Sequence, residues 1–405
     1  MFLDSYVDVA SKLTDAPEIF HYYIGHGLIS TLLGNRVFLH EGVDYLRPNL
    51  YIAIVAPSSA YRKSTCLNIA SKLLHEIDRD LIYPDEFSQE KILEIMSEHP
   101  VGMMFHYEMA SLMGQLKKDY MSGCKSFLTS MYDSPKEYSR KIKTKDFLIK
   151  EPSLNMIAAT TSQWLVGNMS ELDILGGFLP RWIIVPSANK IRNDPFRQAQ
   201  DHNSWFHMKG ELEALRELKG PMHLTKKAKS DYEEWYRDFW KKYCAEGLFS
   251  PFYVRYQVNA LKFAMNHSAS RMKMEIDEAS IGEACERIDW LAKNLKVFEN
   301  EEMVFGKINQ MKKKVEKIIK AAGDAGVSRS VVIRRSHLSK FELDGVIDTL
   351  VAEDAILKTA YGHSQWYLWT PDGTDAEYEL ERALMKERLG LNVKSTSNES
   401  FKMIK

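Results

Sequence analysis

The spacing of apolar residues predicts alternating strands and helices over the first 190 residues. Four short apolar runs, each bounded by prolines or polar residues, have the length of buried strands and lie at 50–56, 101–107, 154–159 and 182–186. Segments with helical spacing fall between them, at 64–78, from Ser88 onward, at 109–118 and at 123–132. Strands that alternate with helices in this way are typical of a largely parallel, buried sheet. The predicted fold class is therefore α/β.

The pattern differs on either side of this region. Residues 19–33 predict a helix that ends at Gly34-Asn35. Residues 190–220 are polar and are expected to form an irregular connector, and the helical spacing from 225 to about 295 predicts a helical subdomain. A helix is predicted at 307–322. Two helices in close succession, at 328–335 and 338–353, and a β-hairpin then indicate a winged helix-turn-helix.

Composition restricts the class of protein without naming a partner. The chain has 405 residues and a formal net charge of -1, so overall charge gives no sign of a nucleic-acid partner. Its four cysteines form no CxxC pair, which argues against a zinc site and favours a reducing compartment. The N-terminus lacks the features of a signal peptide, and no apolar run reaches about 18 residues. We therefore expect a cytoplasmic protein without a membrane partner.

The first predicted strand runs into a loop and then a helix, which is the context of a phosphate-binding loop. Loop N–H groups and the helix N-terminus would hold phosphates, Lys63 would reach the β- and γ-phosphates of ATP, and Ser64 would ligate Mg²⁺. The pattern G-x-x-x-x-G-K-[ST] is met in part, and we assign Ala56 and Arg62 to the two glycine positions. The alternative is a surface Lys-Ser-Thr that caps a helix. The residues expected to contact the nucleotide are Ser59, Ala60, Arg62, Lys63, Ser64 and Thr65.

Polar residues near the other predicted strands supply candidate partners for this loop. Glu108 ends the second strand and would polarise the attacking water, while Tyr107 stands where an Mg²⁺-binding Asp is expected. Thr160 follows the third strand and would sense the γ-phosphate. Arg181, after two glycines and a proline, would serve as an arginine finger across a subunit interface. The alternatives are a helix-start glutamate, a capping threonine and a surface arginine.

Two stretches of the chain are strongly basic although its overall charge is close to zero. Residues 136–150 carry six Lys or Arg against two acidic residues and alternate as a hairpin would. Residues 306–340 carry ten against two, although the helix that follows is acidic. The alternatives are a solvated basic loop for the first stretch and a protein-contact module for the second. The candidate DNA-binding residues are Arg140, Lys141, Lys143, Lys145, Arg334, Arg335, His337 and Lys340.

Four blocks within about residues 15–295 resemble a P-loop domain family of unknown function found in replication proteins of plasmids, prophages and integrated elements. That family is similar to AAA+ ATPases of the superfamily-3 and MCM helicase kind. The resemblance implies that Lys63, Ser64, Glu108 and Arg181 take the roles given above, and Arg255 would be a further nucleotide sensor. Ala56 and Tyr107 depart from the common pattern. The blocks are HGLISTLLGNRVFLHEGVDYLRPNLYIAIVAPSSAYRKST, VGMMFHYEMASLM, KEPSLNMIAATTSQWL and GGFLPRWIIVP.

The predicted protein is an AAA+-like ATPase of a mobile genetic element that acts on DNA as a helicase or translocase, with ATP and Mg²⁺. It would be a homo-oligomer, expected to be a hexameric ring. The alternatives are a DNA-binding initiator or regulator that hydrolyses ATP weakly or not at all, and an ATPase of a defence system. The expected parts are a helical segment 1–48, a P-loop ATPase core 49–190, a helical lid 191–300, a winged helix-turn-helix 301–370 and a charged tail 371–405.

Overall fold

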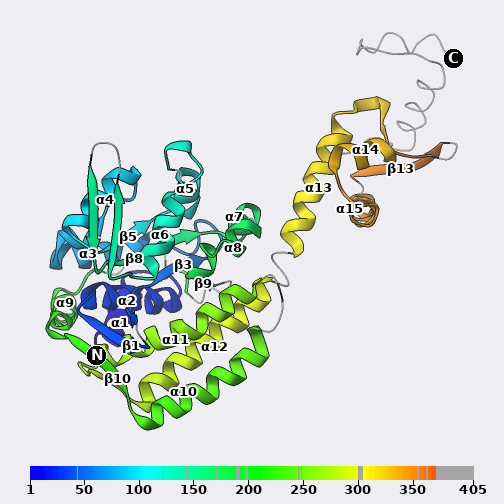
Figure 1. The fold of residues 1–405 in the computed structure, drawn as a ribbon. Coiled ribbons are helices and arrows are strands. Elements are labelled where there is room, and N and C mark those ends of the chain that lie inside the picture. The colour runs from blue at the N-terminus through cyan, green and yellow to red at the C-terminus, as the bar shows by residue number, and fades with distance from the viewer. Residues whose placement is uncertain are drawn as a thin grey trace, which may run out of the picture. The chain divides into compact units, whose positions relative to one another are not determined.

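The computed structural model divides the chain into two compact units, Met1–Glu302 and Met303–Lys405 (Figure 1). The division lies beside the boundary that the sequence predicts after residue 300, and the boundaries predicted within the first unit stay predictions. The predicted tail, 371–405, lies outside the described residues. The structure describes residues 1–370 except for 43, 122, 142–144, 170, 188–191, 195, 197–198, 245–246, 248, 300–303, 354 and 362–363.

A five-stranded parallel sheet forms the centre of the first unit, which confirms the α/β prediction. Every residue of the central strand is buried, as expected for a strand covered on both faces. All four predicted strands are present, and the short edge strand at Ile82 was not predicted. The order across the sheet is β4 (Ile82–Tyr83), β5 (Val101–His106), β8 (Ser153–Thr160), β3 (Tyr51–Val55) and β9 (Trp182–Pro186).

Helix α2 (Glu18–Leu33) packs against this sheet and is buried over most of its surface. It is apolar all round, as a core helix is. A Cβ at Gly27 would lie 3.0 Å from Ile157 of β8 and 3.1 Å from Met103 of β5, so this glycine permits the close approach. The other helices of this part are α1 (Phe2–Leu13), α3 (Lys63–Ile77), α4 (Gln89–Glu98), α5 (Met109–Gln115), α6 (Cys124–Tyr132), α7 (Ser162–Asn168) and α8 (Glu171–Leu175).

Two elements of the first unit differ from the prediction. A second sheet joins strands far apart in the chain, in the order β11 (Glu275–Ile276), β10 (Gly220–Leu224), β1 (Val37–Glu41) and β2 (Asp44–Leu46). The expected connector at 190–220 is wrong in part, because it contains helix α9 (His202–Ala214). That helix begins at Asp201, whose carboxylate accepts two backbone N–H bonds, and it buries Trp205, Met208 and Leu212.

The helical subdomain predicted at 225–295 is present. Its last two helices pack on each other along their length. The helices are α10 (Lys226–Phe239), α11 (Ser250–Ser270) and α12 (Glu278–Phe298). Among the described residues, none of the helices is long and apolar enough to cross a membrane.

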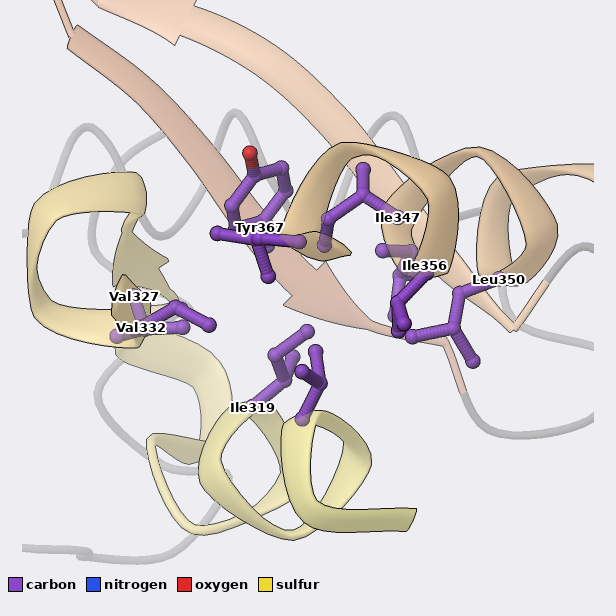
Figure 2. Packing of buried hydrophobic residues seen from close by; sticks show 10 residues of the cluster. Ile319, Val327, Val332, Ile347, Leu350, Ile356 and Tyr367 are labelled. Carbon is purple, nitrogen blue, oxygen red and sulfur yellow. The ribbon is translucent and has the colours of Figure 1, made fainter. Parts of the chain in front are cut away.

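The second unit contains the three predicted helices and the predicted hairpin. Ten buried side chains from all of these elements form its core (Figure 2). The elements are α13 (Val304–Lys320), β12 (Val327–Ser328), α14 (Arg329–Ser336), α15 (Lys340–Ala352), β13 (Ile356–Tyr361) and β14 (Ser364–Trp369). The core residues are Val315, Ile319, Val327, Val332, Leu343, Val346, Ile347, Leu350, Ile356 and Tyr367.

Candidate functional site

The loop between β3 and α3 is exposed from Pro57 to Ala60 and contains two non-glycine residues in left-handed conformations. Ser59 has φ 66° and Arg62 has φ 51°. Glycine adopts this conformation freely, whereas other residues are strained by about 1–2 kcal/mol each. Arg62 thus holds the backbone shape that a glycine would hold in the motif. Counted back from Lys63, the first glycine position is Pro57, so our assignment of it to Ala56 is wrong by one residue.

Lys63 opens helix α3, and its side chain turns back over the loop. Its Nζ donates to the backbone oxygens of Ala56 at 2.7 Å and Pro57 at 2.8 Å. Partial burial lowers the pKa of this ammonium from its usual value. The first-turn N–H groups of a helix have no intrahelical acceptor, and Arg62 supplies no side-chain cap. Ser64 is exposed beside this helix end, while the N–H of Thr65 donates to Arg62 O at 3.0 Å.

Thr160 and Glu108 lie at the same edge of the sheet as Lys63, where the parallel strands end. Thr160 ends β8 in register with Val55, and its carbonyl accepts the Ala56 N–H at 3.3 Å, next to the loop. Glu108 follows β5, is exposed and precedes the first residue of α5. One strand separates β5 from β3, which puts their ends about 10 Å apart. Lys63, Thr160 and Glu108 therefore share one edge of the sheet. The connection after β3 runs to one side of this strand, and the connection after β8 runs to the other side. Ligands of such sheets usually bind at this point.

The structure adds two residues at this edge that the sequence interpretation did not assign to the site. Nδ1 of buried His106 lies 2.5 Å from Oδ1 of Asp85, which follows the edge strand β4. Nε2 of His106 has no hydrogen-bond partner among the described residues. Tyr107 is hydrogen-bonded to Ser71 of α3, and burial raises its pKa. The signal in the sequence was the polar pair His106-Tyr107 at the end of an otherwise apolar strand.

Arg181 and Arg255 lie at the opposite edge of the sheet. Arg181 precedes β9, whose first residue pairs with the first residue of β3. Its buried guanidinium donates to Gly177 O at 2.7 Å and to Asp133 Oδ2 at 2.6 Å. Arg255 of α11 approaches the other carboxylate oxygen of Asp133 at 3.5 Å. A five-residue strand spans about 16 Å, so Arg181 and Arg255 both lie far from Lys63 of the same chain, and the role of Arg255 as a nucleotide sensor stays a prediction.

We expect Asp133→Ala to lower the free energy of unfolding by about 2 kcal/mol. The change leaves the Arg181 guanidinium buried without its carboxylate, which costs about 3–5 kcal/mol in a fully buried pair and less here because Asp133 is half exposed. Urea denaturation measures the loss. The matched control is Asp8→Ala, which removes an exposed pair with Lys12 on α1 and should change stability by less than about 0.5 kcal/mol. Equal midpoints for Asp133→Ala and the wild type would contradict the expectation.

The predicted basic hairpin exists as β6 (Glu137–Lys141) and β7 (Asp146–Lys150). Lys141 is strongly exposed and lies 3.4 Å from Asp146. Lys145 is held 2.9 Å from Glu94 of α4, and that contact, with Lys91, lowers the pKa of Glu94 to about 2. Arg140 is half-buried, and Lys143 lies outside the described residues. Lys141 is therefore the most exposed of the predicted DNA-binding residues of the hairpin that the structure describes.

The predicted basic residues of the second unit gather where α14 turns into α15. Arg334 and Arg335 lie in the last turn of α14, His337 follows in a left-handed conformation and Lys340 opens α15. All four are exposed, and none forms an ion pair with another described residue. They therefore form one exposed basic cluster.

The acidic residues of α15 form hydrogen bonds or ion pairs with other residues of the second unit. Glu342 closes a capping box with Ser339, and Asp344 forms a two-pronged ion pair with Arg329, one arm at 3.0 Å. Asp348 lies 3.9 Å from Lys358, and Glu353 pairs with Lys312. Three of these four carboxylates thus pair with cations of the second unit, whereas no residue of the basic cluster has an ion-pair partner among the described residues.

The Arg329–Asp344 pair should make the docking of α14 on α15 sensitive to acid. Arg329 lowers the pKa of Asp344, so the stabilisation is present above the ordinary carboxyl value near 3.8 and is lost as pH falls through the lowered value. We expect the protection factors of the amides in both helices to fall in the wild type below about pH 4, after correction for the intrinsic effect of pH on exchange. Asp344→Asn should lack this acid step, whereas Asp348→Asn should keep it. A step of equal size in both variants would contradict the assignment.

Comparison with known proteins identifies no relative for this chain: no family model matches it, and no curated protein matches it.

Proposed function

We propose that the chain is a P-loop ATPase that acts on DNA, as a helicase or translocase of a mobile genetic element. One observation carries the proposal. The Lys63 ammonium lies over the exposed loop that joins the buried parallel strand β3 to the N-terminus of α3. Thr160 and Glu108 at the same sheet edge support it. The resemblance of the four sequence blocks to the replication-protein family agrees with this arrangement.

The residues of the loop fit the phosphates of a nucleotide. The ammonium of Lys63 has two loop carbonyls as acceptors, and phosphate oxygens would replace them at little cost because the loop is exposed. The uncapped N–H groups of α3 would hold the same phosphates. Mg²⁺, when bound, neutralises phosphate charge, and the Ser64 hydroxyl would hold it. Glu108 would orient the attacking water, and Thr160 would contact the γ-phosphate from the adjacent strand.

The proposal for DNA binding rests on the second unit. Its helices α14 and α15, with the hairpin β13–β14, would form a winged helix-turn-helix in which α15 enters the major groove. Asp344, Asp348 and Glu353 pair with cations of the second unit, which weakens the argument for a protein-contact module. The exposed basic cluster of Arg334, Arg335, His337 and Lys340 would then contact phosphates or base edges.

The proposal includes a homo-oligomer, with a hexameric ring as the expected form, DNA in its pore and a cytoplasmic location. In such a ring Arg181 would act on the nucleotide of a neighbouring subunit. Since its guanidinium is buried against Asp133, that role requires Arg181 to leave this ion pair. Measuring particle size by light scattering with an ATP analogue and DNA tests the assembly.

A DNA-binding initiator that binds nucleotide but turns it over weakly or not at all is the second candidate. Two observations favour it: Pro57 and Arg62 stand at the two glycine positions of the motif, with Arg62 in a strained left-handed conformation, and Tyr107 occupies the place of an acidic residue. Arg62 is also tethered to buried Asp15 at 3.4 Å, which restrains the loop.

Glu108→Gln separates the two candidates. For an ATPase we expect ATP binding to stay within about threefold of the wild type while DNA-stimulated hydrolysis falls by about 100-fold, the usual effect of losing a group that assists proton transfer. Glu98→Gln, at an exposed carboxylate of α4, is the matched control and should leave both properties unchanged. Wild-type binding without hydrolysis above background would favour the initiator instead.

A further inference from the structure

Phe341, the second residue of α15, is the most exposed large apolar side chain among the described residues. Its exposed fraction is 89%, whereas the next apolar residues of the helix, Leu343, Val346 and Ile347, are buried in the core of the second unit. One exposed apolar residue is common on protein surfaces and has no meaning alone. The residues around Phe341 indicate why this side chain is exposed.

Gly345 lies one helical turn after Phe341 on the same outward face of α15. A Cβ at this glycine would meet no atom within 4 Å, so nothing within the described part of this unit requires a glycine there. Glycine in a helix interior is also unfavourable relative to alanine. Glycine serves where a backbone comes close to a ligand, so a partner lying against this face of α15 beside Phe341 would account for it.

The charges around Phe341 favour DNA over an apolar protein surface. Lys340 precedes it, and Arg334, Arg335 and His337 lie just before α15. The N-terminus of the helix is closed by the Ser339–Glu342 capping box, so the side chains, not the helix end, remain available to a partner. Phe341 is therefore an apolar side chain set among exposed basic residues.

We propose that Phe341 contacts the C5 methyl group of one thymine in the major groove of duplex DNA, and that Gly345 permits the helix to lie close to the bases. The first residues of a recognition helix reach base edges, and apolar side chains recognise the thymine methyl group. This inference rests on the proposed DNA binding and adds a preference for thymine at one position.

The experiment uses the full chain and a pool of randomised 20-base-pair duplexes. The duplex that the wild type selects is then made with each thymine replaced in turn by deoxyuridine, which lacks only the methyl group. We expect one replacement to weaken wild-type binding about three- to tenfold and to leave Phe341→Ala unaffected. Phe206→Ala, at another strongly exposed phenylalanine on α9, is the matched control and should behave as the wild type.

A second variant tests the role of the glycine against a purely structural explanation. Gly345→Ala should raise the melting temperature, because alanine favours a helix, and should weaken binding of the selected duplex more than tenfold. A more stable protein that binds the selected duplex as tightly as the wild type would overturn the role of Gly345.

The outcomes distinguish this inference from the proposed function. If the wild type binds no duplex, the DNA-binding part of the proposed function fails, and the inference fails with it. If it binds DNA with the expected salt dependence, but Phe341→Ala responds to every deoxyuridine as the wild type does, only the inference is overturned. Equal weakening of all duplexes by Phe341→Ala, or a wild type with no preferred duplex, also overturns it.

Discussion

Lys63→Ala is expected to weaken ATP binding by about 100-fold and to reduce hydrolysis to background. A hydrogen bond to a charged group contributes about 1.5–3 kcal/mol, and each 1.4 kcal/mol is a factor of ten in affinity. Without nucleotide, the melting temperature should stay close to that of the wild type, because Lys63 is only partly buried and its acceptors belong to the loop. Nucleotide should raise the melting temperature of the wild type but not of the variant.

Lys229→Ala is the matched control for Lys63. This lysine is exposed on α10, so the change removes the same charge and the same side chain from a surface without loop contacts. It should bind and hydrolyse ATP as the wild type does. If Lys63→Ala retained wild-type affinity and hydrolysis, the assignment of the loop as the nucleotide site would be wrong.

The triple variant Arg334→Ala, Arg335→Ala, Lys340→Ala is expected to have the largest effect on DNA binding. Each cation that neutralises a phosphate contributes about 0.9 to the slope of log K against log salt concentration. Loss of three such contacts should flatten the slope by about 2.7 and weaken binding more than tenfold at low salt. Fluorescence anisotropy with a labelled duplex, repeated over a series of salt concentrations, measures both quantities.

A second triple variant removes the same charge elsewhere. Lys226, Lys229 and Lys293 are exposed residues of α10 and α12, and replacing all three by alanine lowers the net charge equally. The slope should then stay close to that of the wild type. Equal flattening by the two triple variants would mean that binding depends on total charge rather than on the cluster at the α14–α15 turn.

The central sheet could be predicted from the sequence because its strands are apolar on both faces. Runs such as the one at Tyr51–Val55 need no knowledge of their neighbours to be recognised. The second sheet could not be predicted in this way. β1 and β10 are short and half polar, and their pairing joins Val37 to Gly220 across most of the first unit. Helix α9 was missed because only Trp205, Met208 and Leu212 are buried in it, and the stretch around them is largely polar.

The candidate site was predictable where it depends on strand direction and unpredictable where it depends on tertiary partners. Lys63 and Glu108 follow their strands, whereas Arg181 precedes its strand, and in a parallel sheet that difference alone puts them at opposite edges. The contact of Arg181 with Asp133 joins residues 48 positions apart, and no local pattern announces it. The same holds for Asp344, Asp348 and Glu353, whose partners come from α14, β13 and α13.

The second sheet has a consequence for how the first unit folds. Strand β1 can form its parallel pairing only with β10, at residues 220–224, and β10 in turn pairs with β11, at residues 275–276. Pairings over such long sequence distances carry a high entropic cost of loop closure and slow folding. A chain cut at residue 190 would leave the β1 edge open, and open edges promote aggregation. Isolating the central sheet as a fragment should therefore yield an insoluble product, whereas residues 1–302 hold every strand partner together.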